Sequence, residues 1–286
     1  MPTTLVAGAT GYLGRFLVKE LHERGGGVKA VVRDYQRALE VGPHGAPSLA
    51  GLVDRWAIGD MKDPSFVADL CIDVDDVITA LGVTRGSASP WDVDFRANAL
   101  LLRSAQAFGV RQFCAVNVLH SQRIPTQLTR AKSALERLVE QSELVTQVVN
   151  PTAYFSDMMQ ILQMAQRGRV FLLRPEVCIN PISGQDLAQF CVDKQERLVQ
   201  GNWDVGGPEV FTWQDLARCA ADAVDRNSRT TVIPMSIFDW GASFVRRIKP
   251  RQADMMRFLG WVMSHDCVGA LHGTEHLEDA FVARAG

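Results

Sequence analysis

The chain is poor in tyrosine, has few cysteines and carries no excess of positive charge. Its six cysteines are scattered and form no Cys-x-x-Cys pair, which argues against a zinc site and is typical of reduced thiols in a cytosolic protein. A formal net charge of -2 argues against general attraction to nucleic acid. No apolar run is long enough to cross a bilayer, and no basic segment with an apolar core precedes the first expected strand. We therefore expect a cytoplasmic protein without a metal site, a nucleic-acid partner or a transmembrane segment.

The most informative feature that is present is a glycine-rich turn near the start of the chain. An apolar strand is followed by Gly8, Gly11 and Gly14 at three-residue spacing, and then by an amphipathic helix. Gly8 and Gly11 permit a tight turn and a close approach of the backbone to a pyrophosphate, whose charge the helix N-terminus attracts, while Gly14 lets the helix pack on the strand. The pattern predicts a dinucleotide-binding turn. We expect it to comprise Gly8, Ala9, Thr10, Gly11, Tyr12, Leu13 and Gly14.

The end of the next apolar run indicates which dinucleotide binds. Residues 28–32 are nearly all apolar and lead to Arg33, where an NAD-binding chain usually has a carboxylate that holds the ribose 2'-hydroxyl. Because an arginine suits a 2'-phosphate instead, the sequence favours NADP, with NADPH preferred over NADH. Two alternatives stay open: Asp34 could serve the hydroxyl if the strand ends one residue later, and Arg33 could simply end the strand in water.

The order of apolar and amphipathic segments predicts an α/β fold. Strand and helix patterns alternate through about residue 151, as a Rossmann-type, doubly wound parallel sheet requires. We expect a dinucleotide-binding core over residues 1–151. A smaller, mixed α/β lobe over residues 152–286, integrated with the core, should supply much of a substrate pocket at the carboxyl edge of the sheet. Within the core, strands are expected at 28–33, 53–59, 76–81, 112–118 and 146–149, with a surface loop at 85–90.

Several longer motifs occur in one order along the chain. They include Gly-Ala-Thr-Gly-Tyr-Leu-Gly-Arg at 8–15, Val-Val-Arg-Asp at 31–34, Asn-Pro-Thr-Ala-Tyr-Phe-Ser-Asp at 150–157 and Asn-Pro-Ile-Ser-Gly-Gln-Asp-Leu-Ala at 180–188. In these motifs the chain resembles the atypical short-chain dehydrogenases/reductases, especially their divinyl-reductase-like and NmrA-like branches. The resemblance implies further cofactor contacts: Asp60 and Met61 beside the adenine, Ala80, Leu81, Gly82 and Val83 beneath the adenosine, and Pro151 and Phe155 bordering the nicotinamide.

The chain departs from the wider superfamily in its catalytic residues. The resemblance implies a serine after the fifth strand and a tyrosine four residues before the active-site lysine, but the corresponding residues here are Asn117, which we still expect near the cofactor, and Leu128. The lysine is kept as Lys132. It lies on the apolar stripe of a helix expected over residues 126–141, where it needs a polar partner because an unpaired buried charge is costly. The cofactor's ribose hydroxyls would provide one; alternatively, the lysine reaches water along the stripe.

Two other residues are candidate proton donors. Tyr154, one of only three tyrosines, follows the sixth expected strand, and His120 follows the fifth. Either could act as a general acid if a substrate comes within hydrogen-bond distance. A packed tyrosine and a solvated histidine are the plainer interpretations, and a substrate that accepts hydride at an activated carbon could take its proton from water.

One segment near the C-terminus combines basic and bulky apolar residues. Residues 244–251 hold four basic side chains, and the apolar residues of 255–263 follow. Such a pattern occurs in peripheral membrane helices and in partner-binding surfaces. A helix that packs within the C-terminal lobe needs the same apolar residues, and we favour that interpretation over membrane contact.

Two functions fit these observations. The first is an NADP-dependent oxidoreductase that acts on a small carbonyl or conjugated molecule, with Lys132, Tyr154 and His120 as its candidate catalytic residues. The second is a non-catalytic NADP(H)-binding sensor or assembly protein with a protein partner, which the loss of the serine and tyrosine favours. Because Lys132 is kept, we favour the oxidoreductase.

Overall fold

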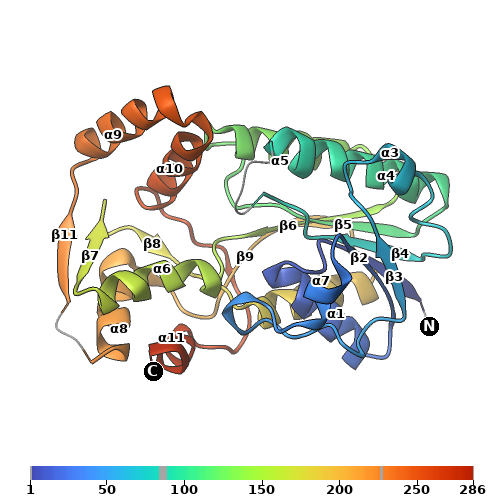
Figure 1. The fold of residues 1–286 in the computed structure, drawn as a ribbon, viewed down its shortest axis with the longest axis horizontal. Coiled ribbons are helices and arrows are strands. Elements are labelled where there is room, and N and C mark those ends of the chain that lie inside the picture. Colours follow the sequence, from blue (N-terminus) through green and yellow to red (C-terminus); the bar gives the residue numbers. More distant parts are fainter. Residues whose placement is uncertain (1, 84–88, 226–227, 286) are drawn as a thin grey trace. The chain divides into compact units, whose positions relative to one another are not determined.

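The computed structural model describes residues 2–83, 89–225 and 228–285, and the chain forms two compact units (Figure 1). The first unit comprises Met1–Ser121, Gln127–Asn150 and Leu187–Trp203. The second comprises the remaining segments, Gln122–Thr126, Pro151–Asp186 and Asp204–Gly286. Each unit is therefore built from three separate stretches of sequence.

An eight-stranded, mostly parallel sheet has the order β12-β9-β6-β5-β4-β1-β2-β3. The strand order reverses between β1 and β4, as in a doubly wound Rossmann fold, so the predicted fold class is confirmed. Ligands of such folds bind at the carboxyl ends of the strands beside this reversal. The strands are β1 (Thr3–Ala7), β2 (Gly27–Val32), β3 (Arg55–Ile58), β4 (Asp76–Thr79), β5 (Gln112–Val116), β6 (Val145–Pro151), β9 (Gly201–Gly206) and β12 (Ala270–Leu271).

Helices of the first unit cover both faces of its strands. In Figure 1, α3, α4 and α5 lie on one face, and α1 and α7 lie on the other. Strands β4 and β5 are buried along their whole length, because helices cover these parallel strands on both faces. Their polar residues Asp76, Thr79 and Gln112 are hydrogen-bonded. The helices are α1 (Tyr12–Glu23), α2 (Tyr35–Leu39), α3 (Pro64–Ala68), α4 (Asn98–Ala107), α5 (Gln127–Glu140) and α7 (Gly184–Glu196), with a short 3-10 turn at Pro43–Gly45.

A helix follows the loop predicted at 85–90, and its first turns are π-helical. This segment, η2 (Trp91–Ala97), continues directly into α4. Asn98 fixes the junction, because it accepts a hydrogen bond from Thr79 at 2.5 Å and donates to the carbonyls of Val93 and Asp94. Residues 84–88 of the predicted loop lie outside the described part of the chain.

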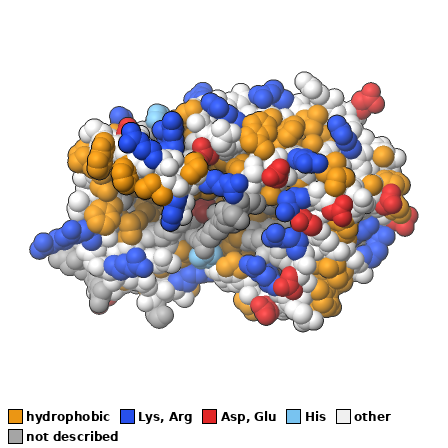
Figure 2. All heavy atoms as spheres, turned by 45° about the horizontal axis from the view of Figure 1, so that its top comes forward, with side chains coloured by type: hydrophobic (Ala, Val, Ile, Leu, Met, Phe, Trp, Pro, Cys, Tyr) orange, Lys and Arg blue, Asp and Glu red, His pale blue; other side chains and the backbone are white. Residues whose placement is uncertain are grey.

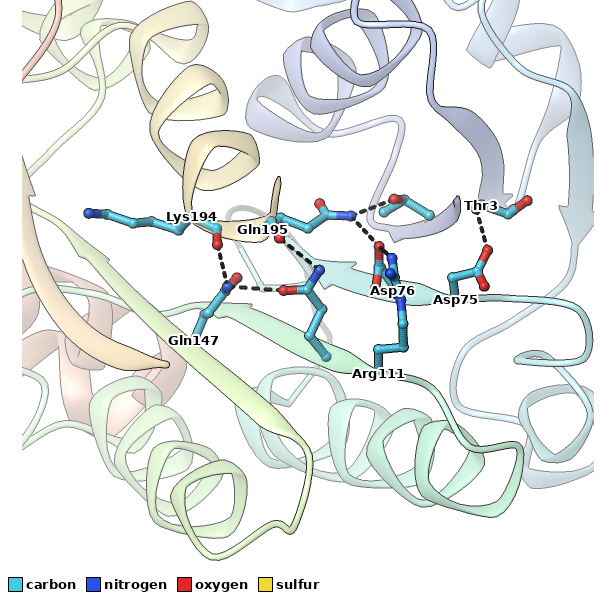
Figure 3. A network of polar contacts seen from close by, with 9 residues as sticks. Thr3, Asp75, Asp76, Arg111, Gln147, Lys194 and Gln195 are labelled. Atoms are coloured by element: carbon cyan, nitrogen blue, oxygen red, sulfur yellow. Dashed lines mark hydrogen bonds and ion pairs between the residues drawn. The ribbon is translucent and has the colours of Figure 1, made fainter. Parts of the chain in front are cut away.

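A buried amide network ties α7 to the amino-terminal ends of the strands (Figure 3). The Gln195 side chain donates to Thr4 at 2.6 Å and to Asp76 at 3.1 Å, and Arg111 pairs with Asp76 at 2.6 Å. Gln112 donates to the Gln195 carbonyl at 3.0 Å. These contacts lie at the edge of the sheet opposite to its carboxyl ends, so they anchor the fold rather than form a ligand site.

The second unit carries two small sheets and several helices. Strands β7 (Arg169–Leu172) and β11 (Arg229–Val232) pair in parallel, and β8 (Cys178–Ile179) and β10 (Phe211–Thr212) pair antiparallel. Among the described residues, no helix has the length and apolar character that crossing a membrane requires. The helices are α6 (Phe155–Gln166), α8 (Trp213–Ala223), α9 (Met235–Ile248), α10 (Pro250–Val262) and α11 (Leu277–Ala285).

Candidate functional site

The glycine turn joins β1 to α1 at the carboxyl edge of the sheet. Gly8 has φ +81°, a left-handed conformation that favours glycine, and a Cβ there would lie 2.8 Å from the Ala80 carbonyl oxygen. A Cβ on Gly14 would lie 2.1 Å from the Gly8 carbonyl oxygen. These two glycines are therefore required by backbone packing within the protein itself.

Gly11 differs from the other two glycines. It is the N-cap of α1, it is exposed, and its N–H donates to the Gly8 carbonyl at 2.9 Å. A Cβ on Gly11 would meet only that carbonyl, at 3.2 Å. Because Gly11 provides no capping side chain to α1, the helix N-terminus is suited to an anionic ligand. The space beside Gly11 is left open by the fold.

Arg33 and Asp60 follow adjacent strands, and both side chains are exposed. Asp60 accepts a hydrogen bond from the Lys62 N–H at 3.0 Å and pairs with the Lys62 ammonium at 3.3 Å. That backbone hydrogen bond, followed by the Lys62 side chain and the Arg33 charge, holds the pKa of Asp60 below its ordinary value. Asp34 is the N-cap of α2 and accepts from the Arg37 N–H at 3.1 Å. One oxygen of Asp34 is thus engaged in the fold, whereas Arg33 projects a charge into solvent beside Asp60.

Lys132 lies in α5 and forms a buried ion pair with Asp94 of η2. The Lys132 Nζ atom is 3.3 Å from Asp94 Oδ1, and the two side chains are 12% and 0% exposed. Lys132 also donates to the Val116 carbonyl, at the end of β5, at 3.4 Å. The chain therefore provides this lysine with a charged partner that the sequence analysis did not identify. The two residues lie in separate helical segments, so their contact leaves no local signal in the sequence.

The segment after β4 lies against this ion pair. The Val83 N–H donates to Asp94 Oδ2 at 3.1 Å. A Cβ added to exposed Gly82 would lie 3.0 Å from Asp94 Oδ1 and 3.6 Å from Lys132 Nζ. Residues 80–83, which the family resemblance links to the adenosine, are therefore next to the ion pair. In this segment Ala80, Leu81 and Val83 are half-buried.

Asn117, which occupies the position of the serine, belongs to a second buried polar cluster. Its Nδ2 atom donates to Glu136 at 3.2 Å, and Ser121 donates to the same carboxylate oxygen at 3.2 Å. Asn202 donates to the other oxygen of Glu136 at 2.8 Å. Asn117 Oδ1 is buried and has no hydrogen-bond partner among the described residues. Glu136 and Asn202 are a further finding of the structure, and their separation in sequence offers no local signal.

The remaining predicted site residues are divided between the two units. His120 belongs to the first unit and has φ +58°, a left-handed turn just after β5. Pro151, Tyr154 and Phe155 belong to the second unit. Pro151 ends β6 and is buried, Tyr154 is the N-cap of α6, and Phe155 is 5% exposed. Met61, in the first unit, is 7% exposed. The roles of these residues stay predictions.

The chain is similar in sequence to curated proteins and in fold to solved structures. A Photosystem II assembly factor Ycf39 from Synechocystis sp. is 22% identical over 85% of this chain and 74% of its own length. An NADPH-dependent quinone oxidoreductase from Escherichia coli, solved with NADPH, has a TM-score of 0.76 and 15% identity over 99% of this chain and 100% of its own. That likeness shows the fold.

A plant reductase is a further relative. The chloroplastic Divinyl chlorophyllide a 8-vinyl-reductase from Arabidopsis thaliana is 27% identical over 82% of this chain, and the chain spans 61% of the plant protein's length, less than two thirds. The expected resemblance to divinyl reductases is thereby confirmed. Residues 8–196, more than half of the chain, match the model of a family described as NAD(P)H-binding. The glycine turn, the strand order and this match together show that the chain belongs to the NAD(P)H-binding family.

Proposed function

We propose that the protein is an NADP-dependent oxidoreductase that reduces a small carbonyl-bearing or conjugated molecule. The observation that carries the proposal is the buried Lys132–Asp94 ion pair beside residues 80–83. Burying two charges costs free energy that their mutual attraction only partly offsets. An ion pair at the carboxyl edge of a Rossmann sheet is therefore better explained by a positioning task than by stability.

The residues present fit the cofactor. Exposed Gly11 leaves the N-terminus of α1 open, and Asn117 Oδ1 is a buried acceptor without a partner among the described residues. The cofactor, when bound, supplies a hydride. In this proposal residues 8–14 hold the pyrophosphate and residues 80–83 lie along the adenosine.

Lys132 then has a defined task. Its ammonium group lies between the carboxylate of Asp94 and the Val116 carbonyl. From there Lys132 donates to the ribose hydroxyls, and Asn117 Oδ1 accepts a hydrogen bond from the same end of the cofactor. His120, Tyr154 or water supplies the proton to the reduced substrate. As the predicted substrate lobe, residues 152–286 supply much of the substrate pocket, and Pro151 and Phe155 border the nicotinamide.

The preference for NADP follows from the ends of β2 and β3. Exposed Arg33 is available for a charge-assisted contact with the 2'-phosphate. Asp34, the residue that could favour NAD, has one oxygen engaged as the cap of α2. Asp60 and Met61 then border the adenine.

The test is substrate-dependent oxidation of NADPH with a panel of quinones, enals, ketones and azo compounds. The plant relative's name describes reduction of a vinyl group, and the E. coli structure is of a quinone oxidoreductase, so conjugated acceptors come first. Lys132→Ala should lose turnover, whereas Lys19→Ala, which removes an ammonium paired with Glu23 on α1, should not. Turnover that is equal in both variants would contradict the proposed role of Lys132.

A second candidate is a non-catalytic NADP(H)-binding sensor or assembly protein. Asn117 supports it, because this residue occupies the serine position and is held by Glu136. The relatives named as Photosystem II assembly factors point the same way. This candidate replaces the first if no acceptor is reduced while NADPH changes the association with a protein partner.

A further inference from the structure

The outer face of α9 is apolar and exposed. Ile237 is 59% exposed, Trp240 73%, Phe244 55% and Ile248 67%. Their spacing of three or four residues places them on one stripe of the helix. Trp240 and Phe244 stack on each other with ring centroids 6.3 Å apart. A single exposed apolar residue needs no explanation, but a continuous aromatic and aliphatic stripe does.

Only some of the apolar residues of α9 pack within the protein, on the side of the helix opposite to the stripe. Ala242 is buried, and Phe238 packs against α10, where a Cβ on Gly260 would lie 2.3 Å from its ring. Ala253 and Val262 of α10 are also buried. The expectation that this segment packs within its own lobe therefore holds for α10 and for the inner side of α9. The outer stripe remains in contact with solvent.

A cluster of positive charge adjoins the stripe. Arg246, Arg247, Lys249 and Arg251 are all exposed, and residues 240–253 contain no aspartate or glutamate. The whole chain has a net charge of -2, so this local charge of four, flanked by Asp239 and Asp254, belongs to the end of α9, Lys249 and the start of α10. Figure 2 shows hydrophobic side chains gathered with Lys and Arg side chains near them on this part of the molecule.

We propose that the α9 stripe, together with the basic cluster at the end of α9 and the start of α10, binds the surface of an anionic lipid bilayer. Aromatic and branched side chains on one stripe enter the boundary between headgroups and acyl chains, and adjacent arginine and lysine side chains bind the lipid phosphates. The charge pattern selects this partner over a second copy of the chain, because two copies would bring the two basic clusters together and repel. The helix lies on the bilayer and does not cross it.

The experiment is co-sedimentation of the whole protein with vesicles. Vesicles of phosphatidylcholine alone are compared with an equal mixture of phosphatidylcholine and phosphatidylglycerol. The protein should bind the anionic vesicles, and increasing salt should weaken binding because it screens the phosphates. Two variants should each lower the partition coefficient by about tenfold or more. One changes Trp240 and Phe244 to serine, and the other changes Arg246, Arg247, Lys249 and Arg251 to glutamine.

Matched control variants distinguish binding by this surface from non-specific adsorption to vesicles. Val41 and Val210, which are 74% and 49% exposed, are changed to serine in the apolar control. The charge control changes four exposed arginines elsewhere to glutamine: Arg103, Arg130, Arg197 and Arg229. Both controls should bind vesicles as the unmodified protein does. Retained thermal unfolding transitions show that each variant is folded.

Three results would overturn the proposal. These are an absence of binding to anionic vesicles, equal binding to both kinds of vesicle, and equal losses in the α9 variants and their controls. Sedimentation velocity can give a fourth such result. If the protein is a dimer that Trp240→Ser dissociates, and if it does not bind vesicles, the stripe contacts a second copy of the chain. NADPH binding is measured in parallel, so a failure here is separate from a failure of the proposed oxidoreductase.

Discussion

Asp94 and Lys132 approach to 3.3 Å although they come from different helices of the first unit. Removing one partner leaves a buried charge uncompensated, which is strongly destabilising. Asp94→Asn should therefore lower the free energy of unfolding by about 3 kcal/mol, measured by urea denaturation. The double variant Asp94→Asn with Lys132→Met should recover part of that loss, because both charges are gone. Strictly additive losses would show that the two groups are not coupled.

Arg33 should determine the preference between the two nicotinamide nucleotides. Arg33→Ala removes the charge proposed to bind a 2'-phosphate and should weaken NADPH binding by about tenfold or more, with little effect on NADH. Calorimetry with both nucleotides measures the difference. Arg37→Ala, which removes another exposed arginine four residues further on, should leave both affinities unchanged. If the unmodified protein binds NADPH and NADH with equal affinity, the proposed role of Arg33 is wrong.

Gly11→Val should separate binding from folding. A side chain at Gly11 meets only the Gly8 carbonyl, so the chain should fold, yet the added methyl groups enter the path of the pyrophosphate. We expect nucleotide binding to be lost in calorimetry with a nearly unchanged Tm. Gly14→Val should instead destabilise the fold, because its Cβ would overlap the Gly8 carbonyl. Normal NADPH affinity in folded Gly11→Val would remove the glycine turn from the site.

Two substitutions, Tyr154→Phe and His120→Ala, distinguish the possible sources of the proton. If Tyr154 or His120 is the general acid, Tyr154→Phe or His120→Ala should lower kcat by about a hundredfold or more while NADPH binding is kept. Tyr35→Phe, at an exposed tyrosine, is the matched control. If neither variant loses turnover, water is the proton source. Loss of NADPH binding together with turnover would instead indicate a structural role.

Cys219 should make the protein less stable at alkaline pH. Burial, followed by the nearby carboxylates of Glu278 and Asp222, raises the pKa of this thiol to about 11. The unfolded chain loses the thiol proton at about pH 8.5, so it binds fewer protons than the folded chain above that pH, and stability falls. The loss should develop between about pH 9 and pH 11. Cys219→Ser should reduce this slope in denaturation experiments, whereas an unchanged slope would exclude Cys219 as a cause.

The fold was predictable because its signals are local. Runs of apolar residues gave the strands: the run expected at 112–118 is β5 (Gln112–Val116), and the run at 28–33 is β2 (Gly27–Val32). The spacing of the glycines gave the turn before α1. Clusters of polar residues could not be predicted in this way, because their members come from distant parts of the sequence. Asn202 reaches Glu136 from another stretch of sequence, and Asp94 faces Lys132 from a separate helical segment.

The amide network of α7 determines where the chain can be cut. Gln195 lies beyond residue 151, yet it satisfies Thr4 and Asp76 in the first strands of the sheet. A fragment that ends at residue 151 would lose this partner and would also lose β9, leaving the edge of β6 uncovered. Such an open edge is a template for pairing with other chains. A fragment of residues 1–151 should therefore aggregate when it is produced alone, although the glycine turn, Arg33 and Lys132 all lie within it.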